Sequence, residues 1–259
     1  MNKTLAVAGI VIKELYRRKD FYVLFVLTAV ITLATGAVNF FHDDKIVRFV
    51  KDACMLLIWV STLIIAIVTT ARQIPAERES RTIFPLLAKP VSRAQVIVGK
   101  FLGCWVATGL ALLVFYTFFV VISGSRELNW PLGVYFEGAW MQWLMLGIVI
   151  AATLWGSIHL AAPSSTITIT FVVVVSILMV GRYLKTIALH HTEPTQTALT
   201  ALYYLIPHLE WYDLRDFVVY DQKPAPVGAI FAATLYAWVW SAFFLVLACV
   251  GFRRKSLTT

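Results

Sequence analysis

Long apolar runs alternate with short polar stretches along the whole chain. Six of these runs predict membrane-spanning helices, because each supplies most of the roughly 20 apolar positions that a helix needs to cross a hydrocarbon core of about 30 Å. No Asp, Glu, Lys or Arg stands at the centre of a run, where a charge would oppose insertion. The six runs are residues 21–41, 53–71, 96–123, 138–162, 165–184 and 227–252.

A shorter, amphipathic pattern opens the chain. Within residues 3–19, apolar side chains recur at roughly helical spacing and charged side chains point toward another side. The pattern is typical of a helix that lies in the membrane surface with its basic face toward lipid phosphates. We therefore expect an interfacial helix within residues 1–20; the alternative is a short cytoplasmic extension of the first span. The apolar positions are Leu5, Ala8, Ile12, Leu15 and Tyr16, and the charged ones are Lys13, Glu14, Arg17 and Arg18.

The composition also places the chain in a bilayer. Of the 259 residues, 60% are hydrophobic and 14% are charged, whereas soluble domains carry about a quarter charged residues. The net charge of +8 comes from basic residues beside apolar runs, which favours contact with lipid headgroups over nucleic-acid binding. The three cysteines stand singly and indicate neither disulfides nor a zinc site. We expect an all-α, polytopic membrane protein with one domain over residues 1–259.

The distribution of basic residues predicts the orientation of the spans. If the chain starts inside, the inner loops and ends hold fourteen Lys and Arg residues and the outer loops hold eight. Because positive charge is enriched on the cytoplasmic side, both ends of the chain are predicted to be cytoplasmic. Residues 72–95 then form the one sizeable cytoplasmic loop between spans, and residues 185–226 form the largest outer piece.

The cytoplasmic loop contains a signal for the start of a helix and a short apolar block. Ser92 and Gln95 have the spacing of a capping box, so a helix should start at Ser92 and continue into the third span. The block around Ile83, Phe84 and Leu87 is flanked by charges and, if helical, could insert into a groove on another protein. The alternative is that the block folds back onto the membrane surface.

The outer piece is too apolar for a solvated linker. Pro207 should separate two short helices within it, and its aromatic residues could cap the bundle or lie against the outer leaflet. The residues assigned to this extracytoplasmic cap are Tyr203, Tyr204, Pro207, Trp211, Asp213, Arg215 and Asp216.

Catalysis by this chain is not expected, because the spans contain no paired carboxylates, no HExxH motif and no nucleophile beside a base. Two alternatives use the outer piece. One is a metal site formed by its histidines together with Glu193, and the other is an enzyme acting on lipid through the same histidines and nearby aspartates. The histidines are His190, His191 and His208, and the aspartates are Asp213, Asp216 and Asp221.

Two segments resemble a known family. The sequence ERESRTIFPLLAKPVSRAQVIVGK, residues 77–100, resembles the loop between the second and third spans of ABC-2 type transporter permeases. The sequence YYLIPHLEWYDLRDFVVY, residues 203–220, is similar to the segment that follows the fifth span in one branch of that family. This branch includes multicopper-enzyme maturation and gliding-motility permeases. The residue types of the first pattern are matched by Glu77 or Glu79, Thr82, Leu86, Leu87, Pro90, Val91, Ser92, Arg93, Gly99 and Lys100.

The resemblance implies a non-catalytic permease subunit of an ATP-driven exporter in the bacterial cytoplasmic membrane. Its implied partners are a second permease copy, or a similar permease, and two ATPase subunits. No cofactor is implied in this chain, since the ATPase would hold ATP and Mg. Residues 72–95, which we name the coupling segment, would contain a coupling helix that receives the ATPase stroke. The coupling residues would be Glu77, Arg78, Glu79, Arg81, Thr82, Ile83, Phe84, Leu86, Leu87 and Arg93.

The nature of the substrate is indicated only by the spans. They contain few polar residues, and this favours an amphipathic or lipid-like substrate over a free sugar or ion. The alternative function is a membrane anchor or assembly scaffold that uses the same cytoplasmic loop without moving a substrate.

Overall fold

The chain folds into helices, as its apolar periodicity predicts. The computed structural model describes residues 3–17, 26, 30, 44–79, 92–127, 132–160, 162–190, 195–219 and 225–254, and no β-strand occurs among them. The elements are α1 (Lys3–Arg17), α3 (Asp44–Ala71), α4 (Pro75–Glu79), α6 (Arg93–Glu127), α7 (Leu132–His159), α8 (Pro163–His190), α9 (Thr195–Leu205), the 3-10 helix η1 (Leu209–Tyr212), α10 (Arg215–Val219) and α11 (Val227–Arg254).

Five described helical ranges are long and apolar enough to cross a membrane. They coincide with five of the six predicted runs, while the run at residues 21–41 lies outside the described residues except for the helical positions Val26 and Val30. The five ranges are Lys51–Glu77, Arg93–Val121, Leu132–His159, Pro163–Gly181 and Val227–Arg253. The all-helical class is therefore confirmed, and the span expected at residues 21–41 stays a prediction.

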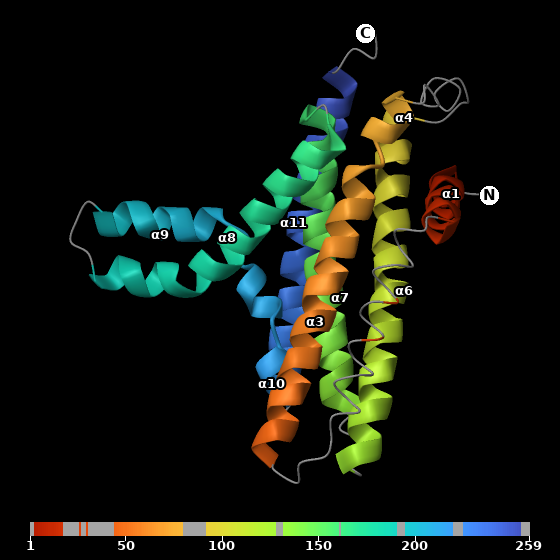
Figure 1. Cartoon of the computed structure of the whole chain (residues 1–259). Coiled ribbons are helices and arrows are strands. Elements are labelled where there is room, and N and C mark those ends of the chain that lie inside the picture. Colours follow the sequence, from red (N-terminus) through yellow and green to blue (C-terminus); the bar gives the residue numbers. More distant parts are fainter. Residues whose placement is uncertain are drawn as a thin grey trace.

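Helix α7 forms the centre of a bundle in which α3, α6 and α11 stand beside it (Figure 1). Its residues are apolar on every side, which is typical of a helix with neighbours all round. In its most apolar membrane-crossing stretch, 78% of the residues are buried. Helices α3 and α6 are half-buried, so their remaining apolar faces are available for lipid or for other subunits.

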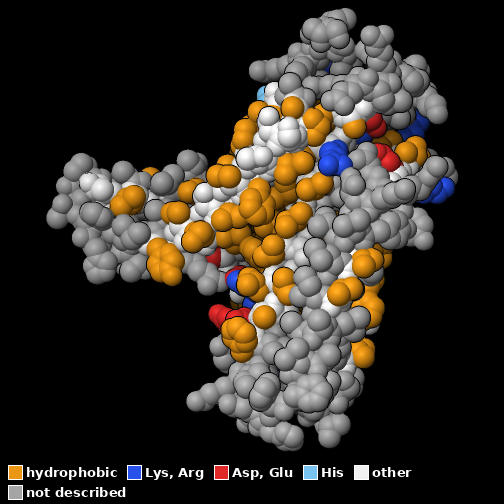
Figure 2. Space-filling model, in the orientation of Figure 1, with side chains coloured by type: hydrophobic (Ala, Val, Ile, Leu, Met, Phe, Trp, Pro, Cys, Tyr) orange, Lys and Arg blue, Asp and Glu red, His pale blue; other side chains and the backbone are white. Residues whose placement is uncertain are grey.

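The outer layer of the bundle is formed by α8 and α11, which bury much less of their surface. In the corresponding apolar stretches, only 11% of the residues of α8 and 22% of those of α11 are buried. Figure 2 shows hydrophobic side chains in a broad band across the middle of the described surface, with the charged groups above and below it. The exposed apolar side chains include Val172 and Val173 on α8 and Leu235 and Val239 on α11. Such faces suit acyl chains or another apolar protein surface.

Beyond the bundle, α8 continues into an arm. The helix runs past Gly181 to His190, and α9 packs back against it, so the two project from the side of the bundle (Figure 1). The span was expected to end at residue 184; the range able to cross a membrane ends at Gly181, and the helix itself continues to His190. The predicted break at Pro207 is confirmed, because α9 ends at Leu205 and a 3-10 helix follows.

The other predicted boundaries are close to the observed ones. Helices α3, α6 and α7 begin nine, three and six residues before the apolar runs predicted to start at residues 53, 96 and 138, because polar flanks continue each helix beyond its apolar run. Helix α7 ends at His159, and Pro163 begins α8. Proline is favoured at a first helical position, where its missing N–H is not needed.

Candidate functional site

The coupling segment is described at its two ends. Glu77 and Arg93 are placed with their side chains, and Arg78 and Glu79 belong to the backbone of α4. The remaining predicted coupling residues lie outside the described residues: Arg81, Thr82, Ile83, Phe84, Leu86 and Leu87. The apolar block therefore stays a prediction, and the geometry of the site comes from the anchors on either side of it.

At its start, the coupling segment leaves α3 through a hydrogen-bonded turn. The amide of Gln73 donates to the carbonyl oxygen of Thr70 at 3.1 Å, and the amide of Ala76 donates to that of Arg72 at 3.1 Å. These bonds carry the chain through a turn at residues 72–74 and into α4, whose first residue is Pro75. Helix α4 has five residues, too few to be stable without tertiary contacts. Its position must therefore be fixed by its neighbours.

A buried lysine on α6 supplies that contact. Lys100 Nζ lies 2.8 Å from Glu77 Oε1, and it donates to the carbonyl oxygen of Gln73 at 3.1 Å and to Gln73 Oε1 at 3.4 Å. The Lys100 side chain is 2% exposed and that of Glu77 is 26% exposed. A buried charge is tolerated only when it is paired and hydrogen-bonded. Lys100 therefore holds α4 and the preceding turn against α6.

At its end, the coupling segment is closed by the predicted capping box. The amide of Ser92 donates to Gln95 Oε1 at 2.9 Å, and the amide of Gln95 donates to Ser92 Oγ at 3.2 Å. Two amides that a helix start would otherwise leave without partners are thus satisfied. Helix α6 begins at the next residue, Arg93, so the capping box is confirmed.

Arg93 then ties α6 to the end of α11. Its Nη1 donates to the carbonyl oxygens of Phe252 at 3.0 Å and Arg253 at 3.1 Å, and its guanidinium lies 5.8 Å from the centre of the Phe252 ring. Carbonyl groups at a helix end lack partners within the helix and carry partial negative charge. Arg93 therefore caps α11. The sequence suggested this residue as a contact for a partner protein, and here it makes a contact within the chain.

Helix α1 packs against the same end of α6. Added β-carbons at Gly99 and Gly103 would lie 2.7 Å from Val7 Cβ and 2.7 Å from Val11 Cβ, so only glycine permits this close approach. Two glycines four residues apart are a known signal for close helix packing. The predicted helix at the chain start is confirmed, but part of its apolar face contacts α6. Its seating on the membrane surface stays a prediction.

Beside the middle of α3, the predicted cap residues include a tight ion pair. Asp213 receives hydrogen bonds from Arg215 Nε at 2.7 Å and Nη2 at 2.8 Å, and the guanidinium lies 5.2 Å from the centre of the Trp59 ring on α3. The hydrogen bonds that Arg215 donates to Asp213 raise the pKa of Arg215 against the opposing effect of burial, so the cation is stable there. Asp216 lies in α10 beside this pair.

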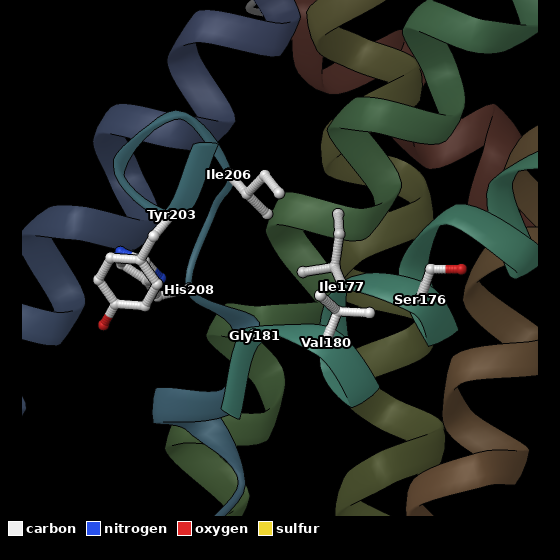
Figure 3. A pocket seen from close by; sticks show the side chains of 7 residues that line it. All are labelled: Ser176, Ile177, Val180, Gly181, Tyr203, Ile206 and His208. Atoms are coloured by element: carbon white, nitrogen blue, oxygen red, sulfur yellow. The ribbon is translucent and has the colours of Figure 1, made fainter. Parts of the chain in front are cut away.

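The base of the arm is fastened to the bundle by aromatic residues. His208 Nδ1 lies 3.2 Å from Glu210 Oε1, and the His208 ring packs on Tyr203 with ring centres 4.2 Å apart. Figure 3 shows these two rings together beside a small cavity of about 150 Å³ that α8 also lines. The Tyr212 hydroxyl donates to the carbonyl oxygen of Ala233 on α11 at 2.7 Å. Burial raises the pKa of Tyr212, which keeps it a neutral donor.

The remaining cap residues are less informative. Pro207 is buried, Trp211 is exposed and contacts the His208 ring, and only the backbone of Tyr204 is described. His191 and Glu193 of the suggested metal site lie outside the described residues. Within the described ranges, no three His, Cys, Asp or Glu side chains come together as metal ligands would. His208 contacts Glu210 instead.

The arrangement offers mechanical links between helices: an ion pair at Lys100, a helix cap at Arg93 and a close helix contact at Gly99. A family model described as ABC-2 family transporter protein matches residues 5–257, nearly the whole chain. The chain belongs to the ABC-2 transporter family. No curated protein matched it. As an ABC-2 protein it is a multi-pass membrane subunit of an ABC transporter. Such subunits are generally not catalytic themselves and normally work with ABC ATPase subunits.

Sequence reasoning identified the pattern of this site but missed its internal contacts. Gly99 and Lys100 were noted only as matches to the ABC-2 pattern, although the first seats α1 and the second anchors α4. The four-residue spacing of Gly99 and Gly103 could have indicated a helix contact. Nothing in the sequence identified Glu77 or Gln73 as partners of Lys100.

Proposed function

We propose that this chain is the transmembrane permease subunit of an ATP-driven ABC exporter in the bacterial cytoplasmic membrane. Both ends of the chain and the coupling segment face the cytoplasm, as the fourteen inner and eight outer basic residues support. The functional unit holds two permease subunits, this chain with a second copy or a similar permease, and two ATPase subunits. ATP and Mg bind to the ATPase. This chain supplies the path for the substrate and the surface that receives the stroke.

The proposal rests on one observation: in this ABC-2 protein, both ends of the coupling segment are anchored to long helices of the chain. The start of the segment is tied to α6 through Lys100 and its end is continuous with α6 at Arg93, which also holds α11. A partner that moves the segment would therefore move long helices. We take the complex to switch between two conformations. Nucleotide can shift the balance between them only if it binds one conformation more tightly than the other.

The apolar character of the spans supports an amphipathic or lipid-like substrate. A groove of about 710 Å³ runs between α6 and α7, and its lining is almost entirely apolar. Aromatic rings contribute much of the lining: Tyr116, Tyr135, Phe136, Trp140 and Trp143. Acyl chains fit such walls better than a hydrated sugar or ion does.

Copurification tests the proposal. Phe84→Asp and Arg81→Glu, both in the coupling segment, should sharply weaken association with the ATPase and abolish ATP-dependent transport. Matched controls are Phe49→Asp and Arg48→Glu, which alter exposed side chains at the start of α3, at the opposite end of the bundle. They should leave association intact. If the coupling-segment variants behaved like the controls, the coupling role would be wrong, and a stoichiometric partner without an ATP site would favour the scaffold function.

A further inference from the structure

Lys100 has hydrogen-bond partners from only one part of the described chain. All three of its polar contacts, to Glu77 Oε1 and to two oxygens of Gln73, belong to the first six residues of the coupling segment. Lys100 lies near the start of α6 and is buried there. Ile97 and Cys104, one turn before and after it, are completely buried. Among the described residues, the ammonium therefore finds its polar partners in residues 73–77.

The two members of the ion pair differ in how firmly they are held. Lys100 belongs to a helix of 35 residues, whereas Glu77 belongs to a helix of five. The Glu77 side chain is 26% exposed, and its Oε2 has no hydrogen-bond partner in the described part of the chain, nor has Gln73 Nε2. Glu77 can move out toward water, but Lys100 cannot follow it without movement of α6.

We propose that the Lys100–Glu77 ion pair is a latch through which the coupling segment moves α6, which makes Lys100 a positioning residue for the coupling. The inference rests on the proposed function. If α4 and the turn before it moved without α6, Lys100 would lose Glu77 and both oxygens of Gln73, and its buried ammonium would be left without a partner, which is strongly unfavourable. Because that state is avoided, α4 and the first turns of α6 move together.

Arg93 extends the linkage to a third helix. It precedes Lys100 by seven residues, which is about two helical turns, so both side chains leave α6 on nearly the same side. Arg93 holds the last carbonyl groups of α11, while Lys100 holds α4. A displacement of the coupling segment therefore reaches α6 and the end of α11 at the same time.

The test must separate transmission from simple stability. The full-length chain is purified with its ATPase and carries a fluorophore on Leu132→Cys, an exposed position at the far end of α7. The chain without this cysteine corrects for labelling of the native thiols. The measured response is the change in fluorescence on adding ATP and vanadate. The variants are Glu77→Met, Lys100→Met and the double variant, with Thr108→Val as a control that alters another buried polar residue of α6.

Glu77→Met should lower the melting temperature most, because it leaves the buried ammonium without a counter-charge and with only the Gln73 oxygens as acceptors. Lys100→Met should lower it less, because Glu77 can reach water. The double variant should recover stability near that of the unmodified protein, since an apolar pair can replace a buried ion pair. It should still bind the ATPase, yet its response at residue 132 should fall about tenfold. Thr108→Val should keep the full response.

A double variant with restored stability and a full response would overturn the latch and leave the proposed function standing. If the double variant did not fold, Glu77→Gln decides, since it keeps an acceptor for Lys100 and removes the charge. Its response should fall about fivefold, and an undiminished response would overturn the latch. If the unmodified chain bound no ATPase, the proposed function would fail and the latch with it.

Discussion

Trp105 Nε1 donates a hydrogen bond to the carbonyl oxygen of Trp143 at 3.0 Å, and Trp143 Nε1 donates one to the carbonyl oxygen of Trp105 at 3.2 Å. The two rings stack with centres 4.2 Å apart and planes 9° from parallel. This reciprocal contact joins α6 to α7 in the middle of the bundle. A movement that enters at the start of α6 is therefore carried to the central helix.

A glycine lies opposite each ring, and the approach is closest at Gly109. A β-carbon at Gly109 would overlap Trp143 Nε1 and lie 3.0 Å from its Cδ1, and one at Gly147 would lie 3.1 Å from Trp105 Nε1. Gly109→Ala should therefore force the rings apart and destabilise the protein by about 1–3 kcal/mol. Thermal unfolding in detergent, followed by tryptophan fluorescence, measures the loss.

Gly133→Ala is the matched control for that variant. Gly133 also lies in a helix, and no atom lies within 4 Å of an added β-carbon. Alanine should be neutral there or stabilise the helix by up to about 1 kcal/mol. Equal melting temperatures for the two variants would show that the indole contact does not determine the spacing of α6 and α7.

The capping box at the start of α6 provides a second prediction. Ser92→Ala removes the hydroxyl that accepts the Gln95 amide, and it should cost about 1 kcal/mol of stability. Thr117→Ala on the same helix is the control, because the Thr117 hydroxyl bonds only to the carbonyl oxygen of Leu113, four residues earlier in its own helix. Amide hydrogen exchange should rise in the first turn of α6 for the Ser92 variant alone. Unchanged exchange there would contradict the role of the cap.

The link from Arg93 to α11 provides a third prediction. Arg93→Met removes the donors that satisfy the carbonyl oxygens of Phe252 and Arg253, so the last turn of α11 should fray. Amide exchange of residues 249–254 should accelerate about tenfold, which corresponds to about 1.4 kcal/mol. Arg253→Met, which removes an exposed guanidinium from the same turn, is the control. If both variants exchanged at the same rate, Arg93 would not be holding α11.

The sequence was sufficient for features that depend on local pattern. The five described spans follow from apolar runs alone, because a bilayer requires every backbone amide to be satisfied within its own helix. The start of α6 follows from Ser92 and Gln95, which lie three residues apart and satisfy each other.

Features that depend on distant partners could not be predicted. Lys100 contacts Glu77, 23 residues earlier, and Arg93 contacts a carbonyl group 159 residues later, and neither pairing follows from a periodic pattern. Arg182 follows Gly181 and marks the edge of the apolar run of α8, but nothing in the sequence indicated that the helix would continue beyond it as an arm. Contacts of this kind appear only when the helices are packed.

Site-specific photocrosslinking at Phe84 tests the central claim most directly. A photoreactive phenylalanine analogue is placed at Phe84 in the coupling segment and, as the control, at Phe49, which is exposed at the opposite end of the bundle. The account predicts that the probe at Phe84 forms a crosslink to a nucleotide-binding ATPase subunit and that the probe at Phe49 does not. Crosslinks to an ATPase from Phe49 alone, or none from Phe84 in a complex that hydrolyses ATP and transports, would contradict it.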